Sequence, residues 1–224
     1  MPASEGNGKS STPRSQKGAR TRARLLQAAK EIFEEDGFLE ARISDIAERA
    51  GLSHGSFYHY FDSKEEVFRE VAEAVEDQLS APLAGVILDE SSHAPPQERI
   101  RQALRLNLES YRREAKIIGV IEQMARYDKQ VNAVRMARHQ HSSAQVAASI
   151  RDLQRHGLAD ADLDPKLAAA ALGAMTTRFS EMWLVQGAVS CSFDKAVDQL
   201  ARLFVNALGL SEEPAGEHRR SKAG

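Results

Sequence analysis

Apolar residues recur at spacings of three and four along most of this chain, and this spacing restricts its fold more than any other feature. Between residues 21 and 208 the apolar side chains repeat with the 3.6-residue period of an α-helix. A strand buried on one face would alternate apolar and polar residues, and no such alternation of useful length occurs in the sequence. The sequence therefore predicts an all-α fold.

Glycines and capping residues set the expected ends of these helices. Glycines able to take a left-handed C-terminal conformation follow four of the helical runs, namely Gly37, Gly51, Gly157 and Gly209. Capping residues precede three others, namely Ser53, Ser63 with Glu66 as a capping box, and Asp164 before Pro165. The predicted helices cover about residues 21–36, 43–50, 54–61, a long run from 64, 96–113, 115–127, 128–155, 165–186 and 193–208.

The composition argues against a membrane protein, a secreted protein and a disulfide-bonded protein. The chain has 224 residues, of which 42% are hydrophobic and 28% are charged, and no apolar run approaches the ~20 residues needed to span a bilayer. The first residues lack the apolar core of a signal peptide, so we expect neither secretion nor membrane contact. A single cysteine, Cys191, excludes an intramolecular disulfide and fits a reducing cytoplasm.

Charge and composition also divide the chain. The formal net charge is only −2, but the stretch from Lys9 to Lys30 holds seven basic and no acidic residues. Such a segment is either a solubilising tail or a contact to phosphates, because counterion release depends on local charge. We expect a disordered basic arm at 1–18, a helix-turn-helix domain at 19–64, a larger helical domain at 65–210 and a flexible tail at 211–224. Residues 82–96, which contain three prolines, are predicted to be a connection.

Two short helices separated by Gly51-Leu52-Ser53 have the layout of a helix-turn-helix. Phe57 and Phe61 lie four residues apart and would anchor the second helix in the core. The outward side then carries His54, Gly55, Ser56, Tyr58 and His59. Such a helix can enter the major groove of DNA, while Arg20, Arg22 and Lys64 stand at helix starts, where phosphates are readily bound.

The run from Ile43 to Glu65, ISDIAERAGLSHGSFYHYFDSKE, resembles the helix-turn-helix of tetracycline-repressor (TetR) family regulators. Ile32-Phe33 and Gly37-Phe38 also stand at aromatic and glycine positions of that family, and the similarity covers about residues 21–70. The resemblance implies a three-helix DNA-binding head on a larger helical ligand-binding and dimerisation domain. It implies base-side contacts from Ser44, His54, Gly55, Ser56 and Tyr58, and phosphate contacts from Ser56, His59, Tyr60 and Lys64. We include Ser53, the expected cap, among the DNA-contacting residues.

One position departs from the family pattern. The family usually begins its second helix with a threonine cap, and Arg42 stands there in this chain. A missing N-cap costs about 1 kcal/mol of helix stability. Arg42 is therefore either a solvated side chain or an additional phosphate contact.

The larger domain carries no motif, and its expected roles come from the resemblance. The helices 165–186 and 193–208 would pair with a second copy as a four-helix dimer interface, or else form an ordinary intrachain core. A dimer would place two heads on a palindromic operator in double-stranded DNA. An effector pocket would lie among the central helices, with an apolar, methionine-rich lining suited to a hydrophobic small molecule. The candidate lining residues are Tyr111, Ile121, Met124, Met136, Met175, Phe179, Met182 and Trp183.

Polar side chains in this domain leave alternatives open. Arg178 and Glu181 could anchor a ligand, face water or pair with each other at three-residue spacing. His139-Gln140-His141 could suggest a metal, but a spacing of two puts the imidazoles on different helix faces. We expect a solvated helix there, and neither a metal nor a cofactor.

Other classes of function fit less well. A catalytic serine elbow and a phosphate-cradling glycine loop are both absent from the sequence, so we expect no enzyme. A helical ligand-binding or adaptor protein without DNA binding is the main alternative, and an activator with the same fold is another. The resemblance implies a bacterial cytoplasmic protein that associates with the nucleoid and most often acts as a repressor.

Overall fold

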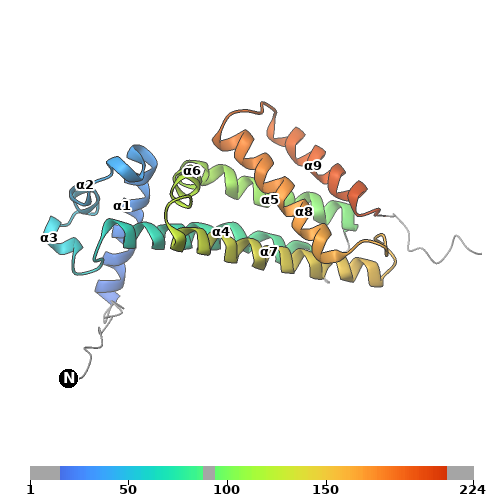
Figure 1. Cartoon of the computed structure of the whole chain (residues 1–224), viewed down its shortest axis with the longest axis horizontal. Helices are drawn as coiled ribbons and strands as arrows, with labels where there is room; N and C mark the ends of the chain where they lie inside the picture. The colour runs from blue at the N-terminus through green and yellow to red at the C-terminus, as the bar shows by residue number, and fades with distance from the viewer. Residues whose placement is uncertain (1–15, 88–93, 211–224) are drawn as a thin grey trace, which may run out of the picture. The chain divides into compact units, whose positions relative to one another are not determined.

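The computed structural model describes residues 16–87 and 94–210, with the side chains of residues 80–93 outside the description. Within those ranges every regular element is helical, as the apolar spacing predicted (Figure 1). The elements are α1 (Gln16–Glu40), α2 (Ile43–Arg49), α3 (His54–Phe57), α4 (Lys64–Ile87), α5 (Pro96–Arg113), α6 (Ala115–Met124), α7 (Lys129–Arg155), α8 (Pro165–Ser180), the π-helical turn η1 (Glu181–Val185) and α9 (Phe193–Ala207). Two compact units meet between Glu73 and Ala74, inside α4.

The first helix is longer than the sequence predicted. It begins at Gln16, so residues 16–18 of the predicted disordered arm are helical, while the rest of that arm and the predicted tail at 211–224 lie outside the described residues. Gly37 takes the expected left-handed backbone with φ of 73°. The chain resumes helical geometry after this kink and continues to Glu40.

Aromatic side chains form the core of the first unit. Phe33, Phe38 and Phe68 pack together, with ring centroids 5.0 to 5.8 Å apart. Phe57 and Phe61 are buried side by side, as their four-residue spacing predicted, with centroids 5.6 Å apart. Burial of each such ring stabilises the unit by roughly 1.5–3 kcal/mol. The first three rings join α1 to the start of α4, and the other two bury the inner side of α3 and of the turn after it.

The third helix is shorter than predicted. It ends at Phe57, although the sequence suggested residues 54–61. The backbone then tightens: the N–H groups of His59 and Tyr60 donate to the carbonyls three residues earlier, at 3.3 and 2.9 Å. Bonds of this spacing form the tighter turns that often end an α-helix. Tyr58, His59 and Tyr60 therefore stand on a turn that follows the helix.

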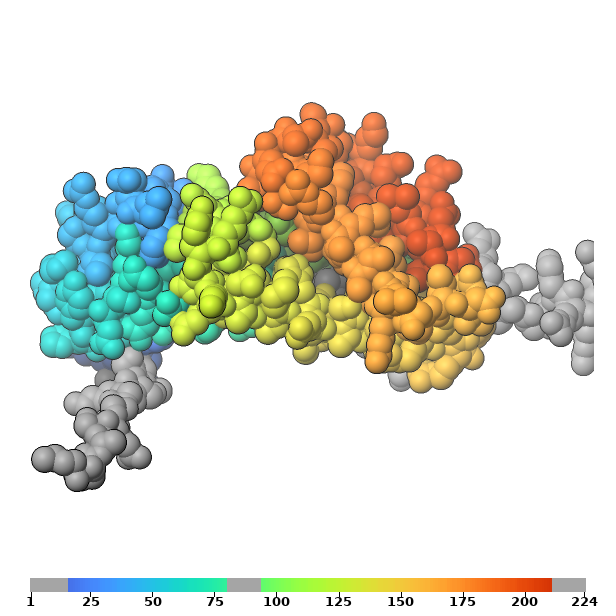
Figure 2. Space-filling view, viewed as in Figure 1, coloured from blue at the N-terminus to red at the C-terminus, as the bar shows by residue number. Residues whose placement is uncertain are grey.

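Two helix pairs make up most of the second unit: α7 packs on α8, and α5 packs on α9. Figure 2 shows α7 and α8 side by side on the face turned to the viewer. Their buried core includes Leu104, Leu108, Ile150, Leu172 and Leu200. The four helices form the scaffold in which the cavity described below is found.

Several boundaries in this unit differ from the sequence predictions. Helix α4 continues to Ile87 through Pro82, so the predicted connection cannot begin at Pro82. The helix predicted for 165–186 changes at Glu181 from α to π geometry, and π turns often occur at functional sites. None of the described helices combines the length and apolarity that a membrane span requires.

Candidate functional site

The exposed surface around α3 is the first candidate site. The Ser53 side chain caps α3 as predicted, accepting a hydrogen bond from the Ser56 N–H at 3.3 Å. Phe57 is buried, which turns the opposite side of this short helix to solvent. His54 and Tyr58 lie there with their rings edge to face at 5.4 Å, and Tyr58 is 48% exposed. The aromatic rings of His54, at the start of α3, and Tyr58, just after its end, are thus presented together on the exposed side.

The twelve residues predicted to contact DNA separate into two groups by exposure. The exposed group is Arg20, Arg42, Ser44, Ser53, His54, Gly55, Tyr58 and His59. The half-buried group is Arg22, Ser56, Tyr60 and Lys64. All twelve belong to the first unit.

Two of the half-buried cations are engaged inside the first unit. The Lys64 Nζ donates to the backbone carbonyls of Phe38, Leu39 and Ala41 at 2.7, 3.1 and 2.8 Å, and lies 4.7 Å from the centre of the Phe38 ring. Arg22 pairs with Glu70, and its guanidinium lies over the Phe61 ring. Both cations hold elements of the fold together, a role that the sequence did not reveal.

Arg42 is not a helix cap. Its backbone is extended at the start of α2, and its side chain makes no capping hydrogen bond, as expected from the missing threonine. The side chain is exposed and is available to reach a phosphate.

Arg24 supports the turn between α2 and α3, which sequence reasoning missed. Its Nη2 donates to the carbonyl of Ala50, at the end of α2. A Cβ added at Gly51 would lie only 2.8 Å from that Nη2, and Gly51 has a φ of 67°. Glycine is therefore needed at Gly51 for both its backbone and the space that Arg24 occupies.

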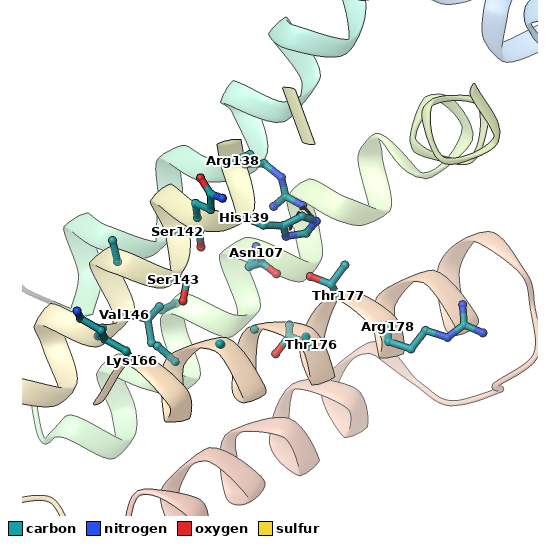
Figure 3. Close-up of a pocket in the computed structure, with 18 of the residues that line it drawn as sticks. Asn107, Arg138, His139, Ser142, Ser143, Val146, Lys166, Thr176, Thr177 and Arg178 are labelled. Carbon is teal, nitrogen blue, oxygen red and sulfur yellow. Dashed lines mark hydrogen bonds between the residues drawn. The ribbon is translucent and has the colours of Figure 1, made fainter. Parts of the chain in front are cut away.

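A cavity of about 780 Å³ in the second unit is the second candidate site (Figure 3). Its walls come from α5, α7 and α8, with Glu122 of α6, Glu181 of η1 and Phe204 of α9. This volume is typical of pockets that hold small organic molecules. The cavity lies within the one unit.

Only Met136 among the predicted pocket residues lines this cavity. Tyr111 and Ile121 are buried, and Met124 and Met182 are half-buried elsewhere. Met175, Phe179 and Trp183 pack on the hydrophobic core instead. The lining is thus not methionine-rich: small residues of α8 face polar residues of α7.

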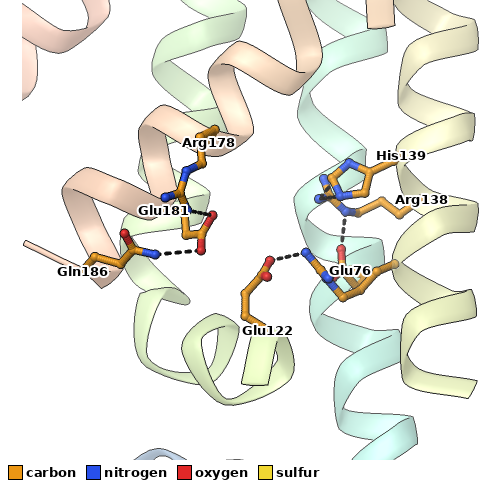
Figure 4. A network of polar contacts seen from close by, with 8 residues as sticks. Glu76, Glu122, Arg138, His139, Arg178, Glu181 and Gln186 are labelled. Carbon is orange, nitrogen blue, oxygen red and sulfur yellow. Dashed lines mark hydrogen bonds and ion pairs between the residues drawn. The ribbon is translucent and has the colours of Figure 1, made fainter. Parts of the chain in front are cut away.

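Charged side chains are concentrated along one part of the lining (Figure 4). Arg138 pairs with Glu76 of α4, and Arg135 pairs with Glu122. Glu76 is only 5% exposed, and this burial raises the pKa of its carboxyl although both arginines oppose the shift. Sequence reasoning could not predict the contact of Glu76 with Arg138, because the two residues are far apart along the chain.

The sequence left open whether Arg178 and Glu181 pair with each other, and in the structure they do. They pair with each other at 2.7 Å, and Glu181 also accepts a hydrogen bond from Gln186 at 2.9 Å. Both residues also contribute to the cavity lining. The π turn η1 begins at Glu181 and so places this carboxylate against the cavity.

His139 also lines the cavity. Burial, reinforced by Arg138 and Arg135, lowers its pKa to about 4, so the imidazole is neutral near pH 7. Its ring nitrogens lie 3.4 Å from the Arg138 Nη2. Among the described residues, no cluster of three or more metal-binding side chains exists around it or elsewhere.

Known proteins match both the head and the whole fold. Residues 25–71 match the family described as bacterial regulatory proteins, tetR family. The transcriptional regulator UidR of Escherichia coli strain K12 is 27% identical over 158 residues, which cover 68% of this chain and 76% of UidR. The repressor NicS of Pseudomonas putida is 30% identical over 108 residues, covering 48% of this chain and 50% of NicS.

The solved structures agree with this assignment at the level of the fold. A TetR-family regulator from Mesorhizobium loti superposes with a TM-score of 0.73 at 23% identity, covering 87% of this chain and 98% of that one. The matched residues 25–71 contain α2, α3 and the turn between them, where the exposed aromatic surface lies. Residues 25–71 therefore form the helix-turn-helix head of the TetR family of bacterial regulators, and the described chain has the fold of TetR-family regulators.

Proposed function

We propose that this protein is a ligand-responsive repressor that binds a palindromic operator as a dimer and is released by a small molecule with a hydrophobic body. The observation that carries the DNA-binding part is the capped helix α3, whose inner side is anchored by Phe57 while His54 and Tyr58 stand exposed. Residues at the amino end of such a helix reach base edges in the major groove. Repression is the activity named for the relative NicS.

The residues predicted to contact DNA divide into two roles. Ser44, His54, Gly55, Ser56 and Tyr58 would face the bases, where their hydrogen-bonding groups can distinguish base pairs. Arg20, Arg42, Ser53, His59 and Tyr60 would contact phosphates, which position the protein without reading sequence. Lys64 and Arg22 support these contacts chiefly through the fold of the head, because their charged groups are engaged within it.

A dimer would be formed by α8 and α9. Leu167 on α8 and Leu203 on α9 are 72% and 49% exposed in the single chain, and α8 also exposes Ala171, one turn after Leu167 and outside the cavity lining. Exposed apolar side chains beside small residues allow two helices to approach closely. Two copies of the head could then occupy successive major grooves, about 34 Å apart.

The proposed regulation is a two-state equilibrium. Without effector, the dimer holds its heads at the spacing of the operator. A molecule that fills the 780 Å³ cavity and binds the other state more tightly moves α4 and lowers operator affinity. A ligand with equal affinity for both states would have no effect.

Selection of bound sequences from random DNA, followed by binding measurements on variants, tests the DNA-binding part. His54→Ala should change the preferred sequence, because a base contact is removed. His59→Ala should weaken binding to all sequences alike, because it removes a phosphate contact. His141→Ala, an exposed histidine of α7, is the control and should bind like the wild type.

Gel shifts at low and moderate salt separate the alternatives. Failure to enrich any sequence, with no shift of DNA from upstream of the coding region, would favour a ligand-binding or adaptor protein without DNA binding. A reporter gene placed behind the selected site distinguishes repressor from activator: expression should rise when the protein is absent.

A further inference from the structure

A buried asparagine faces the cavity. Asn107 on α5 is 8% exposed and contributes to the cavity lining. Figure 3 shows Asn107 beside Arg138 and His139, with Thr177 of α8 across from them. A buried amide costs free energy unless it is hydrogen-bonded. This end of the cavity therefore presents donors that a ligand can satisfy.

Arg138 can serve a ligand in addition to Glu76. Its Nε pairs with Glu76, and its Nη2 lies near the ring of His139. A guanidinium carries five N–H donors, more than these two contacts use, and its flat edge matches a carboxylate. The side chain is 12% exposed and belongs to the cavity lining. A cation and the Asn107 amide thus converge on one end of the cavity.

The remainder of the lining is apolar or small. Ile100, Leu104 and Val146 contribute aliphatic surface, and Ala169 and Gly173 leave room beside them. An apolar group placed there is removed from water at roughly 25 cal/mol per Å². The cavity therefore combines an apolar compartment with a polar end.

The charge of the lining favours an anion. Five cationic residues line the cavity against two carboxylates, Glu122 and Glu181. Glu76 pairs with Arg138 but does not belong to the lining, and it adds one more carboxylate. The positive charges around the cavity still outnumber the negative ones. Arg178 is paired with Glu181, Arg135 is paired with both Glu122 and Glu76, and Arg151 and Lys166 are exposed. Arg138, whose one carboxylate partner Glu76 is shared with Arg135, is therefore the buried cation best placed to receive an additional acceptor.

We propose that the cavity binds an organic carboxylate with an apolar body, whose carboxylate is held by Arg138 and Asn107. This inference rests on the proposed function for its biological meaning, but it concerns the chemistry of the ligand. The apolar body lies against α5, α7 and α8, and the carboxylate competes with Glu76 for the guanidinium of Arg138. Because Glu76 is on α4, this competition loosens the contact between α4 and α7 in the liganded state.

Calorimetry on the full chain with matched probes tests the ligand class. Octanoate and decanoate should bind, and 3-phenylpropionate provides an aromatic body of similar polarity. The uncharged probes 1-octanol and methyl decanoate should bind at least tenfold more weakly, because they forgo the charged hydrogen bonds. Equal affinity for acids and uncharged probes, or binding of none of the acids, would overturn the proposal.

Variants then locate the carboxylate. Arg138→Gln and Asn107→Ala should each weaken decanoate binding by about 10-fold or more, while methyl decanoate binding stays unchanged. Glu76→Gln should strengthen decanoate binding, because it removes the competing charge. Arg155→Gln is the matched control on the same helix: Arg155 is 72% exposed and outside the lining.

Removing Arg138 deprives the buried Glu76 of its nearest cation, so that variant can lose stability for another reason. The double variant Glu76→Gln/Arg138→Gln replaces the ion pair by two neutral amides that can hydrogen-bond to each other. It should keep the fold and lose the preference for acids over uncharged probes; an unchanged preference would contradict the placement. These titrations contain no DNA, so their failure would leave the DNA-binding proposal standing, and failure of the DNA selection would leave the ligand class standing.

Discussion

Lys64 lies at the first residue of α4, and its ammonium group donates to three backbone carbonyls and contacts the ring of Phe38. All three partners belong to the end of α1 and the segment that follows it. An ammonium has three N–H donors, so these bonds use its full capacity. A phosphate contact would require Lys64 to give up one of them.

Replacing Lys64 by methionine separates its two roles. We expect Lys64→Met to lower the free energy of unfolding by about 1–3 kcal/mol, because charged hydrogen bonds to the end of α1 are lost. DNA binding should weaken for all sequences. If Lys64 acted only on phosphate, thermal melting would be unchanged and the salt dependence of DNA binding would fall by about one phosphate contact. Melting curves and salt titrations therefore distinguish the two roles.

Sequence reasoning identified the residues of α3 but not the partners of the cations. The caps at Ser53 and Ser63 and the anchors at Phe57 and Phe61 are local signals, readable from spacing of three or four residues. Lys64 and Phe38 are 26 residues apart, and Glu76 and Arg138 belong to different helices. Such pairs depend on how helices pack, which apolar spacing does not specify.

At the scale of the helices, the sequence predicted the type and the order of the elements well. It predicted the residues at which they begin and end less well. Helices α2, α5 and α7 have nearly the predicted bounds, because glycine, proline or aspartate marks them. Helix α4 runs past Pro82, and α8 changes to a π turn at Glu181, where no residue type in the sequence signals the change. Most of the predicted pocket residues lie outside the cavity for a related reason: Met175 and Phe179 are on the face of α8 that packs against the hydrophobic core.

The small residues of α8 provide a test at this scale. Gly173 is helical and exposed, and a Cβ added there would have no heavy atom within 4 Å. Gly173→Ala should stabilise the protein by about 0.5–1 kcal/mol, because alanine loses less conformational freedom in a helix. Urea denaturation measures the change.

Gly119 on α6 is the matched control. A Cβ there would lie 3.1 Å from the Val185 Cγ1, so the neighbour must move and part of the gain in helix stability is lost. Gly119→Ala should therefore stabilise less than Gly173→Ala, or destabilise. Equal gains at both sites would contradict the packing of α6 against η1.

At the scale of the whole molecule, the proposed action requires two copies of the chain. A single helix-turn-helix reads only one half of a palindrome, and both the affinity and the spacing of the operator depend on the second head. Leu203 on α9 is 49% exposed although α9 is strongly amphipathic and its other face is buried in the core. A second copy would cover such a side chain.

We expect Leu203→Asp to dissociate the dimer without unfolding the chain, because an aspartate is tolerated at an exposed position but not inside an apolar interface. Analytical ultracentrifugation should show a monomer, with helical circular dichroism preserved and affinity for a full palindrome reduced toward that for a half-site. Leu39→Asp is the control: Leu39 is 74% exposed and lies in the first unit, so the dimer should persist. A Leu203→Asp protein that remained dimeric would place the interface on another surface and would require a different geometry for the two heads.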